Sequence, residues 1–436
     1  MPRCSILVCV QPARGHVGPV LPVVAGLIEA GHDVRVITGR RYGARFEALG
    51  ARWLPLPDGV DFDDSDLDAS FPERRRLRGV ALARFDLTSF VDAIPAHLGV
   101  IDRALDDQRA DVVLCDPLFM GAVPLVLRPA GQRPPVLVLG ILPMVYPVPN
   151  LAPASGPGGA VVHRLAGAAA AYLLRPVQRT AEARVLQASG RRLGFRFSDW
   201  PLAADGLLQF TAPGFEYPRA LDGPPVHFVG PLTSSGTEEH LLPPWWAEVA
   251  ASDRPVVLAT QGTIANAELS DLIAPTISAL EGQDVWVVVS TGGSIAAGDL
   301  PEATNLRTAD YLPFDEVLPR CSVFVSNGGY GGVNHALRHG VPILAVGATE
   351  DKRDVVARVR WSGCGVGIAR RRASARQLGR ALHQLLTDPA YRGRAEHLAA
   401  EIAAAPGLPG LVRVVESYGD GGAQDHRRPG RCAAPQ

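Results

Sequence analysis

The sequence predicts an α/β protein built from two doubly wound, Rossmann-like domains, and two observations carry that prediction. The chain has 436 residues, and because a single hydrophobic core rarely serves more than about 250–300 residues, two domains are expected. Short apolar runs alternate with helical patterns in two separate series, as in parallel sheets covered by helices. Hydrophobic residues make up 47% of the chain, which is enough to fill two cores.

The first series of alternating elements begins at the N-terminus. The run SILVCV at 5–10 is typical of a buried parallel strand, and a turn rich in Gly and Pro separates it from an apolar helix at 20–32. The run DVRVITG at 33–39 completes a βαβ unit, for which a right-handed crossover is expected. Further strands are predicted at 111–116 and 135–143.

The second series begins near residue 255, after a segment at 210–236 that contains the linker. Helical patterns separate its apolar runs, and two more helical segments are expected within 374–404. The strands of this series are predicted within 254–263, 284–293, 322–326 and 341–347. The resulting division is a first domain with its linker at 1–235, a second domain at 236–405, a helix at 406–418 and a disordered tail at 419–436.

Charge and cysteine usage exclude several classes of protein. The net charge is −1, from 43 Lys and Arg against 44 Asp and Glu, whereas proteins that bind nucleic acid normally carry a basic excess. The six cysteines form no C-x-x-C pair and fit neither a zinc site nor a disulfide framework. The N-terminal apolar run is too short for a signal peptide core, and no apolar stretch reaches the length of a membrane span, so a cytoplasmic protein is expected. Lys352 is the only lysine, and chance survival of a bias toward Arg is one explanation for it.

A histidine and an aspartate follow two strands of the first series. His16 lies six residues past the first strand, and Asp116 ends the strand at 111–116. Because open α/β sheets bind ligands at the carboxyl ends of their strands, both residues are expected at one functional edge. A carboxylate that orients an imidazole makes a general-base pair, since it fixes the tautomer and stabilises the imidazolium. The alternative is that His16 caps a helix and Asp116 is structural.

Glycine-rich turns follow three strands of the second series. SNGGYGG at 326–332 lies between a strand and a helix, and QGT at 261–263 and TGG at 291–293 follow two other strands. Backbone N–H groups of such turns, together with a helix N-terminus, bind phosphate. A tight turn with close helix packing would need the same glycines. The P-loop pattern and a G-x-G-x-x-G in the first βα turn are both missing, which disfavours a P-loop ATPase and a dinucleotide oxidoreductase.

Three stretches of the sequence resemble one family of enzymes. They are GHVGPVLPVVAGLIEAGHDV at 15–34, VVLCDP at 112–117 and the stretch from DYLPFDEVL to VVARV at 310–359. They are similar to inverting family 1 glycosyltransferases with the GT-B fold, which include bacterial macrolide and aglycone glycosyltransferases and plant and animal UDP-sugar transferases. The resemblance covers about residues 5–415. It implies a hexosyltransferase whose two domains face across a cleft, with a C-terminal helix that crosses back to the first domain.

The resemblance also implies roles for individual residues. His16 would be the general base that deprotonates the acceptor hydroxyl, and Asp116 its partner. The donor would be a UDP- or dTDP-sugar, used without a metal or cofactor, and one displacement would invert the anomeric centre. The residues implied to hold the donor's base, phosphates and sugar are Thr263, Tyr311, Leu312, Gly328, Gly329, Gly331, Gly332, Asp351 and Lys352.

The sequence departs from the family pattern at three donor-site positions. Asn327 stands where the family has a His that binds the diphosphate, and its amide donates a hydrogen bond but carries no charge. His335 replaces the Glu that binds the ribose, and Phe314 replaces a Gln. We still expect an active subfamily, because the motif keeps its glycine turn, an amide donor, an aromatic ring, an acid and a lysine. The departures leave the donor base and the donor sugar open.

The acceptor is expected to be a lipophilic natural product bound by the first domain. The apolar stretches 80–100 and 140–175 lie where the family forms its acceptor pocket. The candidate walls, each with plain core packing as the alternative, are Phe85, Phe90, Phe119 and Met144. Two other functions stay open at this point, a non-catalytic nucleotide-sugar-binding protein and a GT-B epimerase that acts on a nucleotide sugar. A homodimer is also compatible with the sequence.

Overall fold

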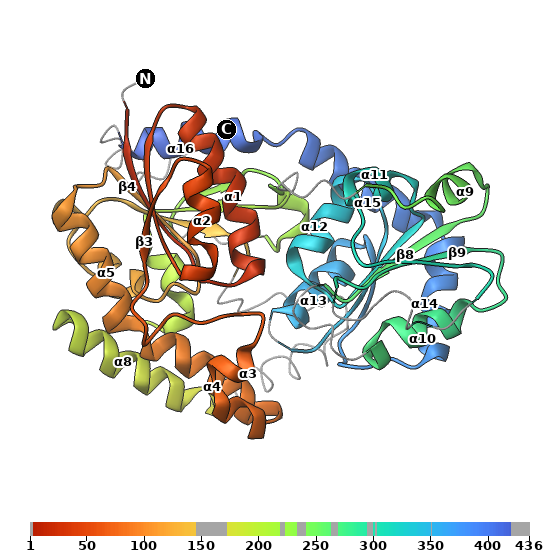
Figure 1. Ribbon diagram of the computed structural model, residues 1–436, viewed down its shortest axis with the longest axis horizontal. Coiled ribbons are helices and arrows are strands. Elements are labelled where there is room, and N and C mark those ends of the chain that lie inside the picture. The colour runs from red at the N-terminus through yellow and green to blue at the C-terminus, as the bar shows by residue number, and fades with distance from the viewer. Residues whose placement is uncertain are drawn as a thin grey trace, which may run out of the picture.

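The computed structural model describes residues 3–144, 172–218, 223–232, 241–262, 269–293, 300, 303–349 and 351–419. These residues form two α/β lobes, each built around its own parallel sheet (Figure 1). The predicted pair of doubly wound halves is therefore confirmed. The predicted boundary at 235, the site residue Thr263 and residues 420–436 of the predicted tail lie outside the described residues. Gly419, the first residue of that predicted tail, is instead the last residue of the C-terminal helix.

The sheet of the first lobe contains seven strands within the described ranges, in the order β3-β2-β1-β4-β5-β6-β7. Its pairings are parallel, and the register sets Cys9 of β1 beside Cys115 of β4. Alternate side chains enter two cores, since Ile6 packs in one cluster and Leu7 in the other. The strands are β1 (Ser5–Cys9), β2 (Asp33–Thr38), β3 (Arg52–Pro55), β4 (Val112–Cys115), β5 (Val136–Gly140), β6 (Gly206–Gln209) and β7 (Val226–Phe228).

Helices cover both faces of this first sheet. Buried side chains of α1, α2 and α16 share one hydrophobic core, and those of α5, α6 and α8 share the core on the opposite face. Burial on both faces explains why the strands read as unbroken apolar runs. The helices are α1 (Arg14–Glu29), α2 (Arg40–Ala48), α3 (Leu67–Ser70), α4 (Gly79–Asp92), α5 (Ile94–Asp107), α6 (Ala122–Val126), α8 (Arg175–Ser189) and α16 (Gly407–Gly419).

The second lobe repeats this plan with a six-stranded parallel sheet within the described ranges, in the order β10-β9-β8-β11-β12-β13. Its strands are β8 (Val256–Thr260), β9 (Trp286–Ser290), β10 (Leu306–Ala309), β11 (Val323–Ser326), β12 (Ile343–Val346) and β13 (Gly365–Ile368). Side chains of α12, α13 and α15 fill the core on one face, and those of α10 and α14 fill the other. The helices are α9 (Trp246–Ala251), α10 (Ile273–Leu280), α11 (Phe314–Val317), α12 (Tyr330–Arg338), α13 (Lys352–Ser362), α14 (Ala375–Thr387) and α15 (Pro389–Ala403).

The C-terminal helix α16 returns from the second lobe to the first. It follows α15 directly and lies along the first lobe beside α1 (Figure 1). Leu411, Val415 and Tyr418 of α16 are buried in the same core as the β1 residue Ile6. Among the described helices no single one is long and apolar enough to cross a membrane, and only the pair α15 and α16, bent by 49°, meets those limits jointly.

A buried polar network joins the two lobes. The Arg358 guanidinium of α13 donates from Nε to Oε2 of Glu216 at 2.7 Å and from Nη2 to the Met144 carbonyl oxygen at 2.6 Å. The Tyr330 hydroxyl at the start of α12 donates to Oε1 of Glu216 at 3.0 Å. Gln209, at the end of β6, donates from Nε2 to the same hydroxyl at 2.8 Å. Helices α12 and α13 of the second lobe are therefore linked to the first lobe.

Candidate active site

The His16–Asp116 pair lies at the carboxyl ends of the neighbouring strands β1 and β4. Asp116 directly follows β4, and its N–H donates to the Cys9 carbonyl oxygen at 2.9 Å. His16 lies in the first turn of α1, which begins at Arg14, and its Nδ1 is 2.7 Å from Oδ2 of Asp116. Sequence position predicted the shared edge, and the structure brings the two side chains into direct contact.

Backbone donors fix the Asp116 carboxylate on its other sides. Oδ2 also accepts from the Gln11 N–H at 3.1 Å, and Oδ1 accepts from the Leu118 N–H at 2.7 Å. The side chain of Asp116 is fully buried, whereas that of His16 keeps 15% of its surface exposed. A rigid carboxylate on Nδ1 leaves Nε2 as the ring atom that can exchange a proton with a ligand.

The pKa of His16 is raised from its usual value of 6.5. Burial of the ring lowers this pKa, but the charge and hydrogen bond of Asp116, with the charges of Asp351 and Asp64, raise it by more in sum. The imidazolium is therefore stabilised at this position, as a group that must take up a proton requires.

Residues of the second lobe face this pair. Asp351, the N-cap of α13, is close enough to His16 for its charge to act on the ring. The guanidinium of Arg14, two residues before His16, lies 5.5 Å from the ring centroid of Tyr311. Leu312, next to Tyr311, is buried in the core of the second lobe. The first lobe's candidate base and the second lobe's candidate donor residues therefore meet between the lobes.

Glycines with positive φ form the turns at the carboxyl ends of β8, β9 and β11. Gly328 has a φ of +86°, which disfavours any residue with a Cβ. The Asn327 side chain of the same turn donates from Nδ2 to the Gln261 carbonyl oxygen, and its Oδ1 accepts from the Gly329 N–H at 3.3 Å. Asn327 thus ties the β11 turn to the β8 turn, a contact that sequence analysis did not predict.

Two helix N-termini lie at this same edge. Gly329 is the N-cap of α12, which carries Gly331 and Gly332 in its first turn, and Lys352 is the first residue of α13. Both helices lie on the side of the second lobe that faces the first (Figure 1). Lys352 is only 8% exposed, and a Cβ on Gly328 would lie 3.4 Å from the Cβ of Lys352. The lysine stem therefore packs directly against the glycine turn.

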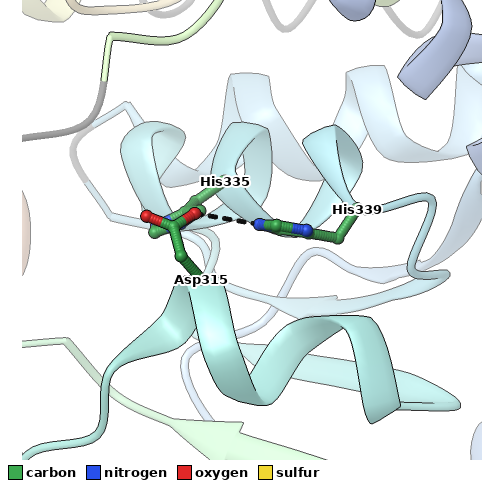
Figure 2. A group of neighbouring side chains, drawn as sticks. All are labelled: Asp315, His335 and His339. Carbon is green, nitrogen blue, oxygen red and sulfur yellow. Dashed lines mark hydrogen bonds and ion pairs between the residues drawn. The ribbon is translucent and has the colours of Figure 1, made fainter. Parts of the chain in front are cut away.

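His335 contacts an acidic residue that sequence analysis missed. Its Nε2 lies 2.8 Å from Oδ1 of Asp315, and Nε2 of His339 lies 3.0 Å from the same oxygen. Figure 2 shows both imidazoles turned toward this carboxylate. Burial, together with the charges of His339 and Arg338, lowers the pKa of His335 by more than the hydrogen bond and charge of Asp315 raise it. Burial raises the pKa of Asp315, but the hydrogen bonds and charges of the two histidines and Arg338 lower it by more.

The candidate acceptor walls divide into two groups. Phe85 and Phe90 of α4 are half-buried, so each has some surface to offer a ligand. Phe119 is fully buried and stacks on His97, with 4.2 Å between ring centroids. Phe119 is therefore a core residue in this structure and not a pocket wall. Met144 is also buried, and its backbone contacts Arg358 in the network between the lobes.

Comparison with known proteins finds glycosyltransferases. Residues 276–417 match the family described as erythromycin biosynthesis protein CIII-like, C-terminal domain. The chain is 35% identical to 4'-demethylrebeccamycin synthase of Lentzea aerocolonigenes over 94% of this chain and 98% of that protein. It is 30% identical to UDP-glycosyltransferase 2 of Phaeomoniella chlamydospora over 93% and 94%, respectively. A solved glycotransferase of kitacinnamycin has the same fold, with a TM-score of 0.72 at 22% identity over 96% of this chain and 100% of that chain.

Proposed function

We propose that this chain, which belongs to the family 1 glycosyltransferases with the GT-B fold, moves a sugar from a UDP- or dTDP-sugar to a hydroxyl of a lipophilic natural product with inversion. The contact of 2.7 Å between His16 Nδ1 and Asp116 Oδ2 is the observation that carries this proposal. It gives a partly exposed imidazole a fixed tautomer at the edge of the sheet that faces the second lobe.

The chemistry that follows uses one displacement. Nε2 of His16 accepts the proton of the acceptor hydroxyl while that oxygen forms a bond to the anomeric carbon. The bond from this carbon to the diphosphate breaks on the opposite face, so the configuration inverts and the nucleoside diphosphate leaves with the bonding electrons. The negative charge of Asp116 stabilises the imidazolium formed in this step.

The donor's negative charge would be met by backbone groups. The glycine turn at 326–332 and the N-termini of α12 and α13 offer N–H groups and positive helix-dipole ends at one edge of the sheet. In this arrangement Lys352 contacts a phosphate or the donor sugar, and Tyr311 stacks on the nucleotide base. The donor needs no metal in this proposal.

The acceptor in this proposal is a lipophilic small molecule. The half-buried rings of Phe85 and Phe90 support a lipophilic acceptor bound by the first lobe. The family match and the relative named for rebeccamycin synthesis support a natural-product acceptor over a protein or polysaccharide. A cytoplasmic location and closure of the lobes to exclude water belong to the same proposal.

Substitution of the proposed base tests the mechanism. His16→Ala should lose at least about 100-fold in kcat, as expected for removal of a general base, while its affinity for UDP or dTDP in calorimetry stays unchanged. His383→Ala, at an exposed position of α14, is the matched control and should keep full turnover. Glycoside formation by His16→Ala at the wild-type rate would contradict the mechanism.

Two further measurements define the donor and the stereochemistry. Calorimetry with UDP, dTDP and GDP identifies the base, and Lys352→Arg should weaken binding or alter sugar preference because a guanidinium fork differs from an ammonium in geometry. Unchanged affinity and preference in Lys352→Arg would remove that residue from the donor site. Proton coupling at the product's anomeric centre reports inversion, and a changed donor without any glycoside product would instead indicate an epimerase.

A further inference from the structure

A cluster of two histidines and one aspartate lies on the second lobe, apart from the His16–Asp116 pair. His335 belongs to α12, His339 caps its C-terminus, and Asp315 belongs to the short helix α11. We propose that these three side chains form a binding site for a divalent transition metal ion such as Zn²⁺. His335 stands at the position where the family pattern has its ribose-binding Glu, so the ion would lie beside the proposed donor site. The inference goes beyond the proposed glycosyl transfer, and its test by metal binding does not depend on that activity.

The geometry brings three ligand atoms to one point. Nε2 of His335 and Nε2 of His339 lie 2.8 Å and 3.0 Å from Oδ1 of Asp315. The three ligand atoms lie within 4.8 Å of one another. Around a tetrahedral ion with bonds of about 2.0–2.2 Å, neighbouring ligand atoms are about 3.3 Å apart. The two nitrogen–oxygen distances would have to lengthen by about 0.3–0.5 Å to reach this separation, and rotation of the side chains can supply that change.

The sequence spacing holds the two imidazoles in place. Residues four apart in a helix lie on the same face, and two histidines at this spacing form one side of many zinc sites. His335 of α12 and His339 at its C-terminal cap both face Asp315 of α11 (Figure 2). The half-exposed Asp315 faces them from a separate element. An ion would thus link α11 to α12, and water would complete its coordination on the exposed side.

The ligand chemistry selects the class of ion. Two imidazole nitrogens and one carboxylate oxygen suit Zn²⁺, Co²⁺ or Ni²⁺, whereas Mg²⁺ and Ca²⁺ prefer oxygen ligands throughout. Arg338 also contacts the cluster, with its Nη1 4.0 Å from Oδ1 of Asp315. Because Arg338 is 45% exposed, its guanidinium can turn toward solvent when an ion binds.

Calorimetric titration of the untagged full-length protein with ZnCl₂ at pH 7.5, after treatment with a chelator, tests the site. One ion should bind per chain, and MgCl₂ should give no binding. His339→Gln and Asp315→Asn should each weaken the affinity at least about tenfold. The visible spectrum of the Co²⁺ form should show nitrogen and oxygen coordination without a thiolate charge-transfer band. Circular dichroism establishes that both variants are folded.

A second histidine–carboxylate pair provides the matched control. Nε2 of His397 lies 3.2 Å from Oε1 of Glu401 on α15, with a single imidazole on an exposed face. His397→Gln should leave the affinity for Zn²⁺ unchanged. Absence of saturable binding would overturn the proposal, and so would binding that survives both His339→Gln and Asp315→Asn. Binding lost in Cys432→Ala but kept in those two variants would place the ion on the C-terminal segment and overturn it too.

Discussion

Asp116→Asn removes the charge beside His16 and keeps the shape of the side chain. In the wild type the carboxylate can only accept, so Nδ1 of His16, at 2.7 Å from Oδ2, carries a proton and Nε2 keeps its lone pair. An amide that presents its NH₂ group to Nδ1 reverses the tautomer. Nε2 then carries the proton and accepts none from an acceptor hydroxyl.

The surrounding hydrogen bonds decide which way the amide turns. If the amide oxygen stays on the Leu118 N–H, at 2.7 Å, the NH₂ group displaces the longer bond from the Gln11 N–H, at 3.1 Å. The opposite orientation would sacrifice the shorter bond, so the first one is favoured. One buried N–H then lacks an acceptor, which costs about 1–3 kcal/mol of stability. A reversed tautomer lowers kcat by about 10³–10⁴-fold, the scale of the same substitution in serine proteases.

Initial rates of glycoside formation at saturating donor, together with urea unfolding, measure the two effects separately. Asp111→Asn is the control, because Oδ2 of Asp111 accepts from the Ser5 N–H at 2.8 Å, at the other end of the same pair of strands. The control should lose stability and keep its turnover. If folded Asp116→Asn protein turns over within tenfold of the wild type, the tautomer argument is refuted.

Three other outcomes follow from the same contacts. Because the pKa of His16 is raised above 6.5, the acid limb of kcat/KM should lie above pH 6.5, and Asp116→Asn should move that limb to lower pH. The stability that the His16–Asp116 pair contributes is fully present below pH 6.5 and is lost as the pH rises through the raised pKa. Gly328→Ala forces a Cβ into a φ of +86° and to 3.3 Å from the Lys352 carbonyl oxygen, so UDP or dTDP should bind at least several-fold more weakly in calorimetry, and an unchanged affinity would count against the phosphate role of the turn. Arg358→Met leaves Glu216 buried without its ion pair, so the free energy of unfolding in urea should fall by about 3–5 kcal/mol, and adding Glu216→Gln should recover most of this loss.

The strands could be predicted from the sequence, because strands buried on both faces read as continuous apolar runs. The ends of helices were harder to predict. The pattern predicted a helix from residue 20, whereas α1 begins at Arg14. Its N-cap, Ala13, makes no side-chain cap, and Pro19 and Pro22 lie inside the helix. Because the sequence lacks a helix-capping residue here and places two prolines inside the helix, local propensity predicted the wrong first residue. Packing against the sheet determines where the helix begins.

The sequence also predicted which site residues share one edge of a sheet, because parallel strands have their carboxyl ends at the same edge. Contacts between segments far apart in the chain could not be predicted from the sequence. Glu216 and Arg358 are 142 residues apart, and no periodic pattern links a buried acid to a buried base. The spacing of His335 and His339 was a visible signal, but Asp315 comes from another element and only the fold unites the three. For Phe119 the sequence left a pocket wall and core packing open, because burial cannot be read from residue type, and its complete burial favours the core.

The return of α16 has a consequence for synthesis of the chain. Leu411 and Val415 complete a core of the first lobe, and the Tyr418 hydroxyl donates to the Asp205 carbonyl oxygen at 3.1 Å. A ribosome releases these residues only after the whole second lobe has been made. One face of the first lobe's sheet therefore stays partly uncovered while the second lobe is synthesised. The core of the first lobe is thus completed last, although its strands are synthesised first.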